Sequence, residues 1–119
     1  MAAKNYFLSG ITELLILYFL NQKDCYVYEI TKAISDFSGG ALVISQNTIY
    51  TAAYKLENDN MITEYSKLVG KKRTRVYYHV EDAGRAYLNE LLETFQTTFH
   101  GISQILTKQI KEEIEDENE

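Results

Sequence analysis

Apolar residues recur every three or four positions in three successive segments of the first half of the chain, which is the period of a helix with a buried face. Residues 5–20 are apolar on most sides and predict a heavily buried first helix. After a polar break, residues 26–37 predict a second, amphipathic helix. A third helix is predicted to begin at Ser45, a residue type that caps helix N-termini, and to end near Asn58.

The next segment, residues 61–80, changes to residue types that pair in strands. Two β-favouring runs flank Gly70, and a glycine in this position predicts the turn of a hairpin. Residues 66–80 also hold five cations and no acid: Lys67, Lys71, Lys72, Arg73 and Arg75. Cations on a protruding tip suit a polyanion such as duplex DNA, because each contacted phosphate releases condensed counterions. The alternative is a solvated hairpin with a charged tip.

The last part of the chain predicts one long helix. Glu81 and Asp82 are acids well placed at a helix start, and the chain then runs to about residue 114 without a proline. Apolar residues along it alternate four- and three-residue steps, the spacing of a coiled-coil seam, and predict a dimer interface. These residues are Leu88, Leu92, Phe95, Phe99, Ile102 and Leu106.

The formal net charge of −5 argues against nucleic-acid binding only at first sight. Residues 111–119 hold six acids and one base, so they account for the whole of this charge and leave residues 1–110 neutral. Because the hairpin carries five positive charges within that neutral part, the charge of the chain is strongly polarised.

The third helix adds a polar face that suits base readout. Its first turns present Gln, Asn, Thr and Tyr, which can hydrogen-bond base edges and phosphates in a major groove, although such residues also occur on ordinary solvent-facing surfaces. Helix, helix, polar-faced helix and basic hairpin is the order of a winged helix-turn-helix. The fold class predicted is therefore α+β and mostly helical, namely a winged helix-turn-helix with a long C-terminal dimerisation helix.

The predicted organisation has three parts. We expect a winged-helix DNA-binding domain over residues 1–82, a dimerisation helix over residues 83–110, and an acidic, disordered tail over residues 111–119. A chain of 119 residues has a thin core, and short helix-rich chains often complete their apolar burial by dimerising.

Residues that could carry catalysis or hold a metal are few. His79 lies in the second strand pattern and His100 on the last helix, without metal-ligand spacing, so both are interpreted as surface or packing histidines. The single cysteine, Cys25, excludes an internal disulfide and favours a reducing compartment. No stretch reaches about 18 consecutive apolar residues. We therefore expect a cytoplasmic protein with no membrane partner, no metal, no cofactor and no enzymatic activity.

Three stretches resemble the PadR family of bacterial transcriptional regulators, and the resemblance covers essentially residues 8–110. They are residues 10–17 (GITELLIL), residues 44–57 (ISQNTIYTAAYKLE) and residues 70–85 (GKKRTRVYYHVEDAGR). The segment Tyr26–Ile30 is also similar to the start of the family's second helix.

The resemblance implies a dimeric winged-helix protein, in most members a repressor, that contacts DNA through the third helix and the hairpin. Asn47 and Thr51 stand where many members have glycine and proline, so the family's usual operator sequence is not carried over to this chain. The residues expected to bind DNA are Tyr28, Ser45, Gln46, Asn47, Thr48, Tyr50, Thr51, Lys55, Lys71, Lys72, Arg73 and Arg75.

The single helix after the hairpin resembles a shorter subgroup of the family, in which the last helix and the partner's first helix form the dimer. Some members of this subgroup sense planar aromatic drugs between the subunits. The candidate effector-binding residues are Tyr6, Phe7, Leu8, Phe95 and Phe99. An ordinary dimer core is the favoured interpretation of the same residues.

Two functions from different classes follow. The leading hypothesis is a homodimeric, sequence-specific regulator of transcription that binds a double-stranded DNA operator, a repressor relieved by a small molecule. The alternative is a winged-helix protein-interaction module that does not bind DNA, which the acidic tail and the sequence pI of about 5.0 favour slightly.

Overall fold

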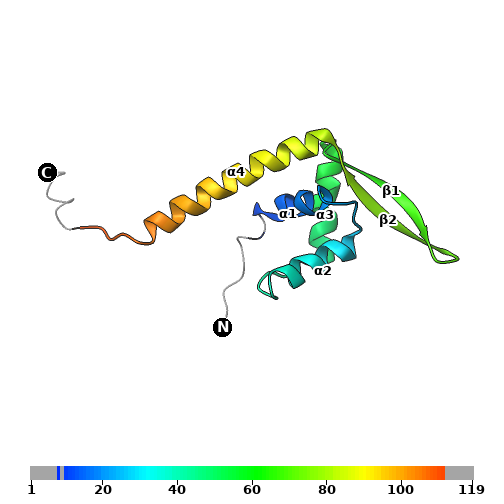
Figure 1. The fold of residues 1–119 in the computed structure, drawn as a ribbon, viewed down its shortest axis with the longest axis horizontal. Coiled ribbons are helices and arrows are strands. Elements are labelled where there is room, and N and C mark those ends of the chain that lie inside the picture. The colour runs from blue at the N-terminus through cyan, green and yellow to red at the C-terminus, as the bar shows by residue number, and fades with distance from the viewer. Residues whose placement is uncertain (1–7, 9, 112–119) are drawn as a thin grey trace. The chain divides into compact units, whose positions relative to one another are not determined.

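The computed structural model describes residues 8 and 10–111, which form four helices and one two-stranded antiparallel sheet (Figure 1). The elements in chain order are α1 (Thr12–Leu20), α2 (Val27–Phe37), α3 (Gln46–Asn58), β1 (Ile62–Val69), β2 (Arg73–Val80) and α4 (Asp82–Ile105). The chain divides into two compact units, one ending at Asn89 and one beginning at Glu90. Three helices followed by a hairpin give the first unit the winged helix-turn-helix fold that the sequence predicts.

Apolar side chains from α1, α2, α3 and the hairpin form the core of the first unit. The largest fully enclosed side chains are Ile16, Leu17, Ile30, Ile49, Leu56, Ile62 and Val80. Ile62 and Val80 are register partners at the base of the hairpin, so the hairpin joins the core through its first residue pair. Tyr78, which is 4% exposed, also belongs to this core, and the turn end of the hairpin extends away from α1, α2 and α3 (Figure 1).

Backbone turns with positive φ end α2 and α3 sharply. After α2, Gly39 and Gly40 have φ values of 63° and 83°, and the Gly40 N–H donates to the Ser35 carbonyl at 2.8 Å. After α3, Asn60 has a φ of 60° and its N–H donates to the Glu57 carbonyl at 3.0 Å. Both arrangements satisfy carbonyls that a helix end otherwise leaves without partners. They fix where the chain leaves each helix and therefore where α3 and β1 begin.

The hairpin has the predicted turn. Its register runs without interruption from the pair Ile62 and Val80 to the pair Val69 and Arg73. The turn between the strands starts at Gly70, whose φ of 71° is easily adopted only by a residue without a side chain. The two lysines that complete the turn, residues 71 and 72, are exposed at the tip.

The first helix is shorter than the sequence pattern predicts. In the described part of the chain α1 begins at Thr12, and the predicted helical residues 5–7 and 9 lie outside it. The Thr12 hydroxyl donates to the Leu8 carbonyl at 2.8 Å, and the Ile11 N–H donates to the same carbonyl at 3.1 Å. These bonds close a turn that precedes the helix.

The last helix also ends earlier than predicted, at Ile105 and not near residue 114. The Thr107 hydroxyl and the Lys108 ammonium both donate to the Gln104 carbonyl, at 2.8 and 3.1 Å, so side chains satisfy the helix end. Leu106, placed on the predicted helical seam, therefore lies beyond the helix. The side chains around this end are exposed, so a longer helix would bury no apolar surface within one chain.

The prediction that Leu88 belongs to the dimer interface is wrong. Its side chain is only 3% exposed, so it belongs to the core of a single chain and is not available to a partner. Among the described residues, no helix combines the length and apolarity that crossing a bilayer requires.

Candidate nucleic-acid interface

Helix α3 presents a polar arc to solvent on the side opposite its buried face. Ile49, Ala53 and Leu56 pack into the core, as the sequence predicts. Because a helix repeats every 3.6 residues, seven of the remaining positions form one exposed surface. Its members are Gln46, Asn47, Thr48, Tyr50, Thr51, Tyr54 and Lys55.

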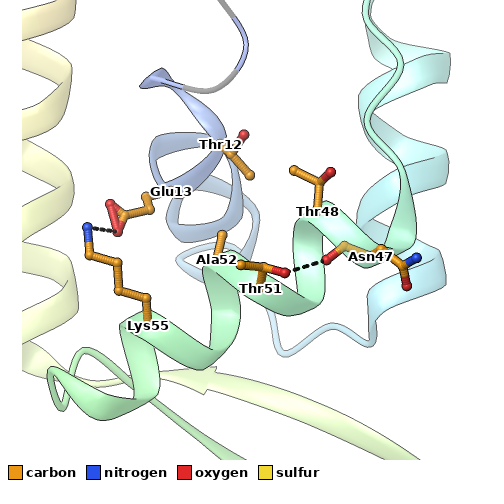
Figure 2. Close-up of a pocket in the computed structure, with 7 residues that line it drawn as sticks. All are labelled: Thr12, Glu13, Asn47, Thr48, Thr51, Ala52 and Lys55. Atoms are coloured by element: carbon orange, nitrogen blue, oxygen red, sulfur yellow. Dashed lines mark hydrogen bonds and ion pairs between the residues drawn. The ribbon is translucent and has the colours of Figure 1, made fainter.

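Two hydroxyls of this region stabilise the helix itself. The Ser45 Oγ accepts the Thr48 backbone N–H at 3.2 Å and lies 2.9 Å from the Thr48 hydroxyl, so Ser45 is the N-cap that the sequence predicts. The Thr51 hydroxyl donates to the Asn47 carbonyl at 2.9 Å. The Asn47 side-chain amide points away from this bond and is exposed (Figure 2). Amide and phenol groups are therefore the main uncharged hydrogen-bonding groups that the arc exposes, since the Thr51 hydroxyl bonds to the backbone and the Thr48 hydroxyl lies against the Ser45 Oγ.

One flank of the arc faces α1 across an open groove of about 440 Å³ (Figure 2). On this side the Lys55 ammonium lies 3.5 Å from a carboxylate oxygen of Glu13 in α1. The Tyr87 hydroxyl of α4 donates to the other oxygen of the same carboxylate at 3.4 Å. The charge of Lys55 is thus already paired with a carboxylate of the same chain. The residues lining the groove are Thr12, Glu13, Asn47, Thr48, Thr51, Ala52 and Lys55.

The other flank of the arc faces the hairpin across a second groove, of about 520 Å³. This groove brings together the starts of α2 and α3 and the tip-side half of β2, three segments that are far apart in sequence. Its lining residues are Tyr26, Val27, Tyr28, Gln46, Tyr50, Arg73, Thr74, Arg75 and Val76. Hydrogen-bonding side chains of the helix and arginines of the hairpin therefore line the same concave surface, which we call the wing groove.

The hairpin has one face that carries both cations and aromatic rings. Opposite residues in an antiparallel register share a face, and alternate pairs lie on the same side, so the pair Tyr65 and Tyr77 shares a face with the pair Lys67 and Arg75, two positions along. The two tyrosine rings are stacked with centroids 5.8 Å apart, and the Lys67 ammonium lies 5.4 Å from the Tyr77 centroid. The hairpin thus carries a cation beside an aromatic ring along its length, in addition to the exposed cations at its tip.

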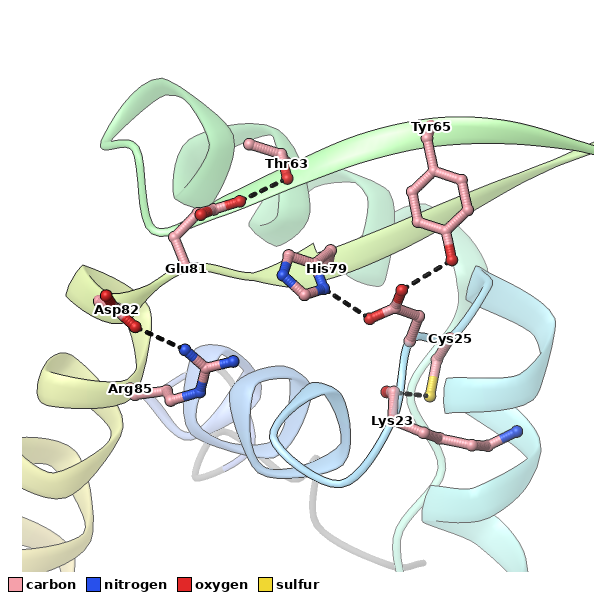
Figure 3. A network of polar contacts seen from close by, with 9 residues as sticks. Lys23, Cys25, Thr63, Tyr65, His79, Glu81, Asp82 and Arg85 are labelled. Atoms are coloured by element: carbon pink, nitrogen blue, oxygen red, sulfur yellow. Dashed lines mark hydrogen bonds and ion pairs between the residues drawn. The ribbon is translucent and has the colours of Figure 1, made fainter.

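The loop between α1 and α2 holds the hairpin with two consecutive residues. The Asp24 carboxylate accepts the Tyr65 hydroxyl at 2.7 Å and lies 2.8 Å from the His79 Nδ1, so it joins both strands. Figure 3 labels Tyr65 and His79 and marks the two contacts with dashed lines. Cys25 exchanges two backbone hydrogen bonds with Tyr78, at 3.3 and 2.8 Å, along the free edge of β2. The orientation of the hairpin is therefore fixed from outside the sheet as well as from its base.

Titration reflects these contacts. Burial alone would raise the pKa of Asp24, but the hydrogen bonds from Tyr65 and His79 outweigh it and lower that pKa below its ordinary value. The hydrogen bond to Asp24, together with burial, raises the pKa of Tyr65 to about 12. Burial raises the pKa of the Cys25 thiol to about 11, so this cysteine is neutral at physiological pH and unsuited to nucleophilic attack.

Comparison with known proteins agrees with this geometry. The model of the transcriptional regulator PadR-like family matches residues 16–90, more than half of the chain. The chain belongs to the PadR-like family. An uncharacterized protein from Lysinibacillus sphaericus is 33% identical over 84 residues, which cover 71% of this chain and 77% of that protein.

Solved structures of PadR-like and related regulators share the fold. A transcriptional regulator from Clostridium thermocellum is 29% identical, with a TM-score of 0.78 over 84% of this chain and 97% of that chain. Bacillus subtilis PadR, solved in complex with operator DNA, is 24% identical, with a TM-score of 0.64 over 69% of this chain and 46% of that chain. The family to which this chain belongs is thus one of transcriptional regulators.

The residues that the sequence predicts to bind DNA lie in four places in the structure. The wing groove collects Tyr28, Gln46, Tyr50, Arg73 and Arg75; the α1 side of α3 holds Asn47, Thr48, Thr51 and Lys55; the hairpin tip holds Lys71 and Lys72; and Ser45 caps α3. Asp24, Tyr26 and Tyr77 are additions that the sequence pattern does not single out, and Lys67, one of the five hairpin cations, is an addition to the residues expected to bind DNA. Strand alternation could have placed Lys67 with Arg75, whereas the contacts from residues 24–26 depend on tertiary packing.

The residues expected to bind an effector are only partly within the described chain. Tyr6 and Phe7 lie outside it, and Leu8 is half-buried just before α1. Phe95 and Phe99, in the second unit, stack with ring centroids 5.9 Å apart and an angle of 24°, and are 44% and 62% exposed.

Proposed function

We propose that this PadR-like protein is a homodimeric transcriptional repressor that binds a pseudo-palindromic DNA operator and is released from it by a small molecule. The observation that supports DNA binding best is the wing groove. There Gln46 and Tyr50 of α3 lie beside Arg73 and Arg75 of the hairpin, so groups suited to base edges and groups suited to phosphates share one concave surface. The complex of Bacillus subtilis PadR with operator DNA shows a protein of this fold bound to such a ligand.

In this proposal helix and hairpin have separate tasks. Each α3 enters a major groove and selects bases, while the exposed cations Lys71, Lys72 and Arg73 hold the flanking phosphates. Two recognition helices related by a two-fold axis would read half-sites about one turn of DNA apart.

The direct test measures operator binding as a function of salt, with DNA from upstream of the protein's own gene. Replacing Lys72 and Arg73 by Ala should weaken binding to all sequences and reduce the slope of log affinity against log salt by about 2, because two phosphate contacts are lost. Asn47→Ala should change base preference at one position and leave that slope unchanged. Lys108→Ala, which removes an exposed cation beyond α4, is the matched control.

Two results would contradict the DNA proposal. A salt slope unaffected by the double substitution would remove the hairpin from the interface. Micromolar or weaker binding that is indifferent to sequence at physiological salt would favour the protein-interaction alternative.

The homodimer is proposed from the second unit taken by itself. Phe95, Phe99 and Ile102 recur on one stripe of α4 and are 44%, 62% and 48% exposed, an apolar surface that a second copy would cover. Phe99→Asp should therefore give monomers in sedimentation at micromolar concentration, whereas Thr98→Asp, on a neighbouring polar position, should leave dimers. Monomeric wild-type protein would contradict the proposal.

The effector is proposed from the same stripe. The stacked rings of Phe95 and Phe99 offer flat apolar faces, so a planar aromatic compound is the ligand class that fits them. Titration of a panel of flat aromatic compounds, followed by calorimetry and by operator release, tests this step. If no compound in a broad panel binds, the rings form dimer core only.

A further inference from the structure

Arg75 is held differently from the other cations of the hairpin. Its guanidinium carbon lies 4.0 Å from the ring centroid of Tyr26, the residue that precedes α2. Arg75 is half-buried, whereas Arg73 and the two tip lysines are exposed. A guanidinium that stacks on a ring keeps its N–H groups at the edges, in the plane that suits bidentate bonding to a phosphate, and the Tyr77 side chain also bonds to this guanidinium.

The Tyr26 ring is itself fixed on two further sides. Its centroid lies 5.5 Å from that of Tyr77 at an angle of 69°, and 6.5 Å from that of Tyr28 at an angle of 21°. The backbone next to it is fixed too, because neighbouring Cys25 is hydrogen-bonded to the edge of β2. Both Tyr26 and Arg75 line the wing groove. A ring with so little freedom can hold the arginine in one direction before DNA arrives.

We propose that Tyr26 is a positioning residue for DNA binding: its ring orients the Arg75 guanidinium toward a backbone phosphate at the edge of the wing groove. The inference rests on the proposed DNA-binding function and assigns a role to a residue that the sequence pattern does not single out. The pre-oriented side chain has less rotamer entropy to lose on binding, so the ring contributes affinity without bonding to the DNA.

The test is a double-mutant cycle between Tyr26→Leu and Arg75→Ala, measured as operator affinity across a salt series. Tyr26→Leu should weaken binding about three- to fivefold, the size of an exposed cation–π contact, and should have no further effect in the Arg75→Ala background. Tyr26→Phe should restore binding because it keeps the ring. Arg75→Lys, which keeps the charge but not the planar group, should bind as weakly as Tyr26→Leu. Tyr18→Leu, which removes an exposed tyrosine of α1, is the control for the loss of a tyrosine.

The possible outcomes separate this inference from the proposed function. Additive effects of the two substitutions would mean that Tyr26 contacts DNA by itself or only supports the fold, and would overturn the positioning role. A loss confined to one operator sequence, with no change of salt slope in Arg75→Ala, would place the guanidinium on a base and overturn the phosphate assignment. Wild-type protein that binds no operator would remove the proposed function, and the cycle would then show no effect of either substitution.

Discussion

The junction between the hairpin and α4 leaves no space for a side chain at Gly84, and a single added methyl group tests that packing. A Cβ built on Gly84 would lie 2.3 Å from the Met61 carbonyl oxygen and 2.8 Å from a methyl carbon of Val80. The Met61 carbonyl is not free to move, because it accepts the Glu81 N–H at 2.9 Å directly before α4 begins. Gly84→Ala must therefore displace backbone.

The expected magnitude follows from opposing contributions. In an unconstrained helix, glycine to alanine stabilises by about 1 kcal/mol. Overpacking against fixed neighbours costs about 1–3 kcal/mol, and weakening the bond to the Met61 carbonyl costs about 1 kcal/mol more. A contact of 2.3 Å requires a backbone shift, so we take about 2 kcal/mol for the overpacking, and the three contributions sum to a net destabilisation of about 2 kcal/mol. For a chain of this size that lowers Tm by about 8 °C.

Urea unfolding followed by circular dichroism, together with thermal melts, measures this change. The matched control is Gly101→Ala in the same helix, where an added Cβ meets nothing within 4 Å and should stabilise by up to about 1 kcal/mol. Opposite signs at the two glycines are the expected result. A Gly84→Ala protein as stable as the wild type, or a loss of equal size at both positions, would refute the packing argument.

Three further predictions concern stability. Ser45→Ala removes the oxygen that caps α3 and should cost about 1 kcal/mol in urea unfolding, whereas exposed Ser103→Ala in α4 should cost much less. Leu56→Ala should cost about 2–5 kcal/mol in the same assay, because the side chain is fully buried. Because the pKa of Asp24 is lower in the folded protein than its ordinary value of 3.8, the ionised carboxylate stabilises the fold at pH values above 3.8. This stabilisation is lost as the pH falls through the folded-state pKa. Asp24→Asn should therefore flatten the fall of Tm below about pH 4. A melt series in which both proteins lose Tm in parallel would contradict the last prediction.

Sequence reasoning succeeded where the signal is local. The cap at Ser45 and the turn at Gly70 each depend on a few neighbouring residues, and the buried face of α3 depends on the helical period alone. Each of these features is therefore visible in a short window of the chain, and the order of elements follows from them.

Tertiary partners were not predictable in the same way. Asp24 lies 41 residues from Tyr65 and 55 from His79, so its bonds to the hairpin depend on how the hairpin is packed. Leu88 fits the apolar spacing of the α4 stripe as well as Phe99 does. Periodicity alone does not show that other residues of the same chain cover Leu88 and leave Phe99 exposed. The early end of α4 depends on side chains that bond to the Gln104 carbonyl, a choice that composition does not reveal.

The pairing of Lys55 with Glu13 bears on how base recognition and phosphate binding are divided between α3 and the hairpin in the proposed DNA complex. Lys55 is the one cation within α3, and Glu13 and Tyr87 gather around it at the junction of α1, α3 and α4. An ammonium already paired with a carboxylate releases fewer counterions on meeting a phosphate, so in the proposed DNA complex the helix contributes little to the salt dependence of binding. The proposal therefore assigns most of that dependence to the hairpin cations. Changes to the exposed amides and phenols of α3 should therefore alter the preferred operator sequence while leaving the sequence-independent affinity for DNA unchanged.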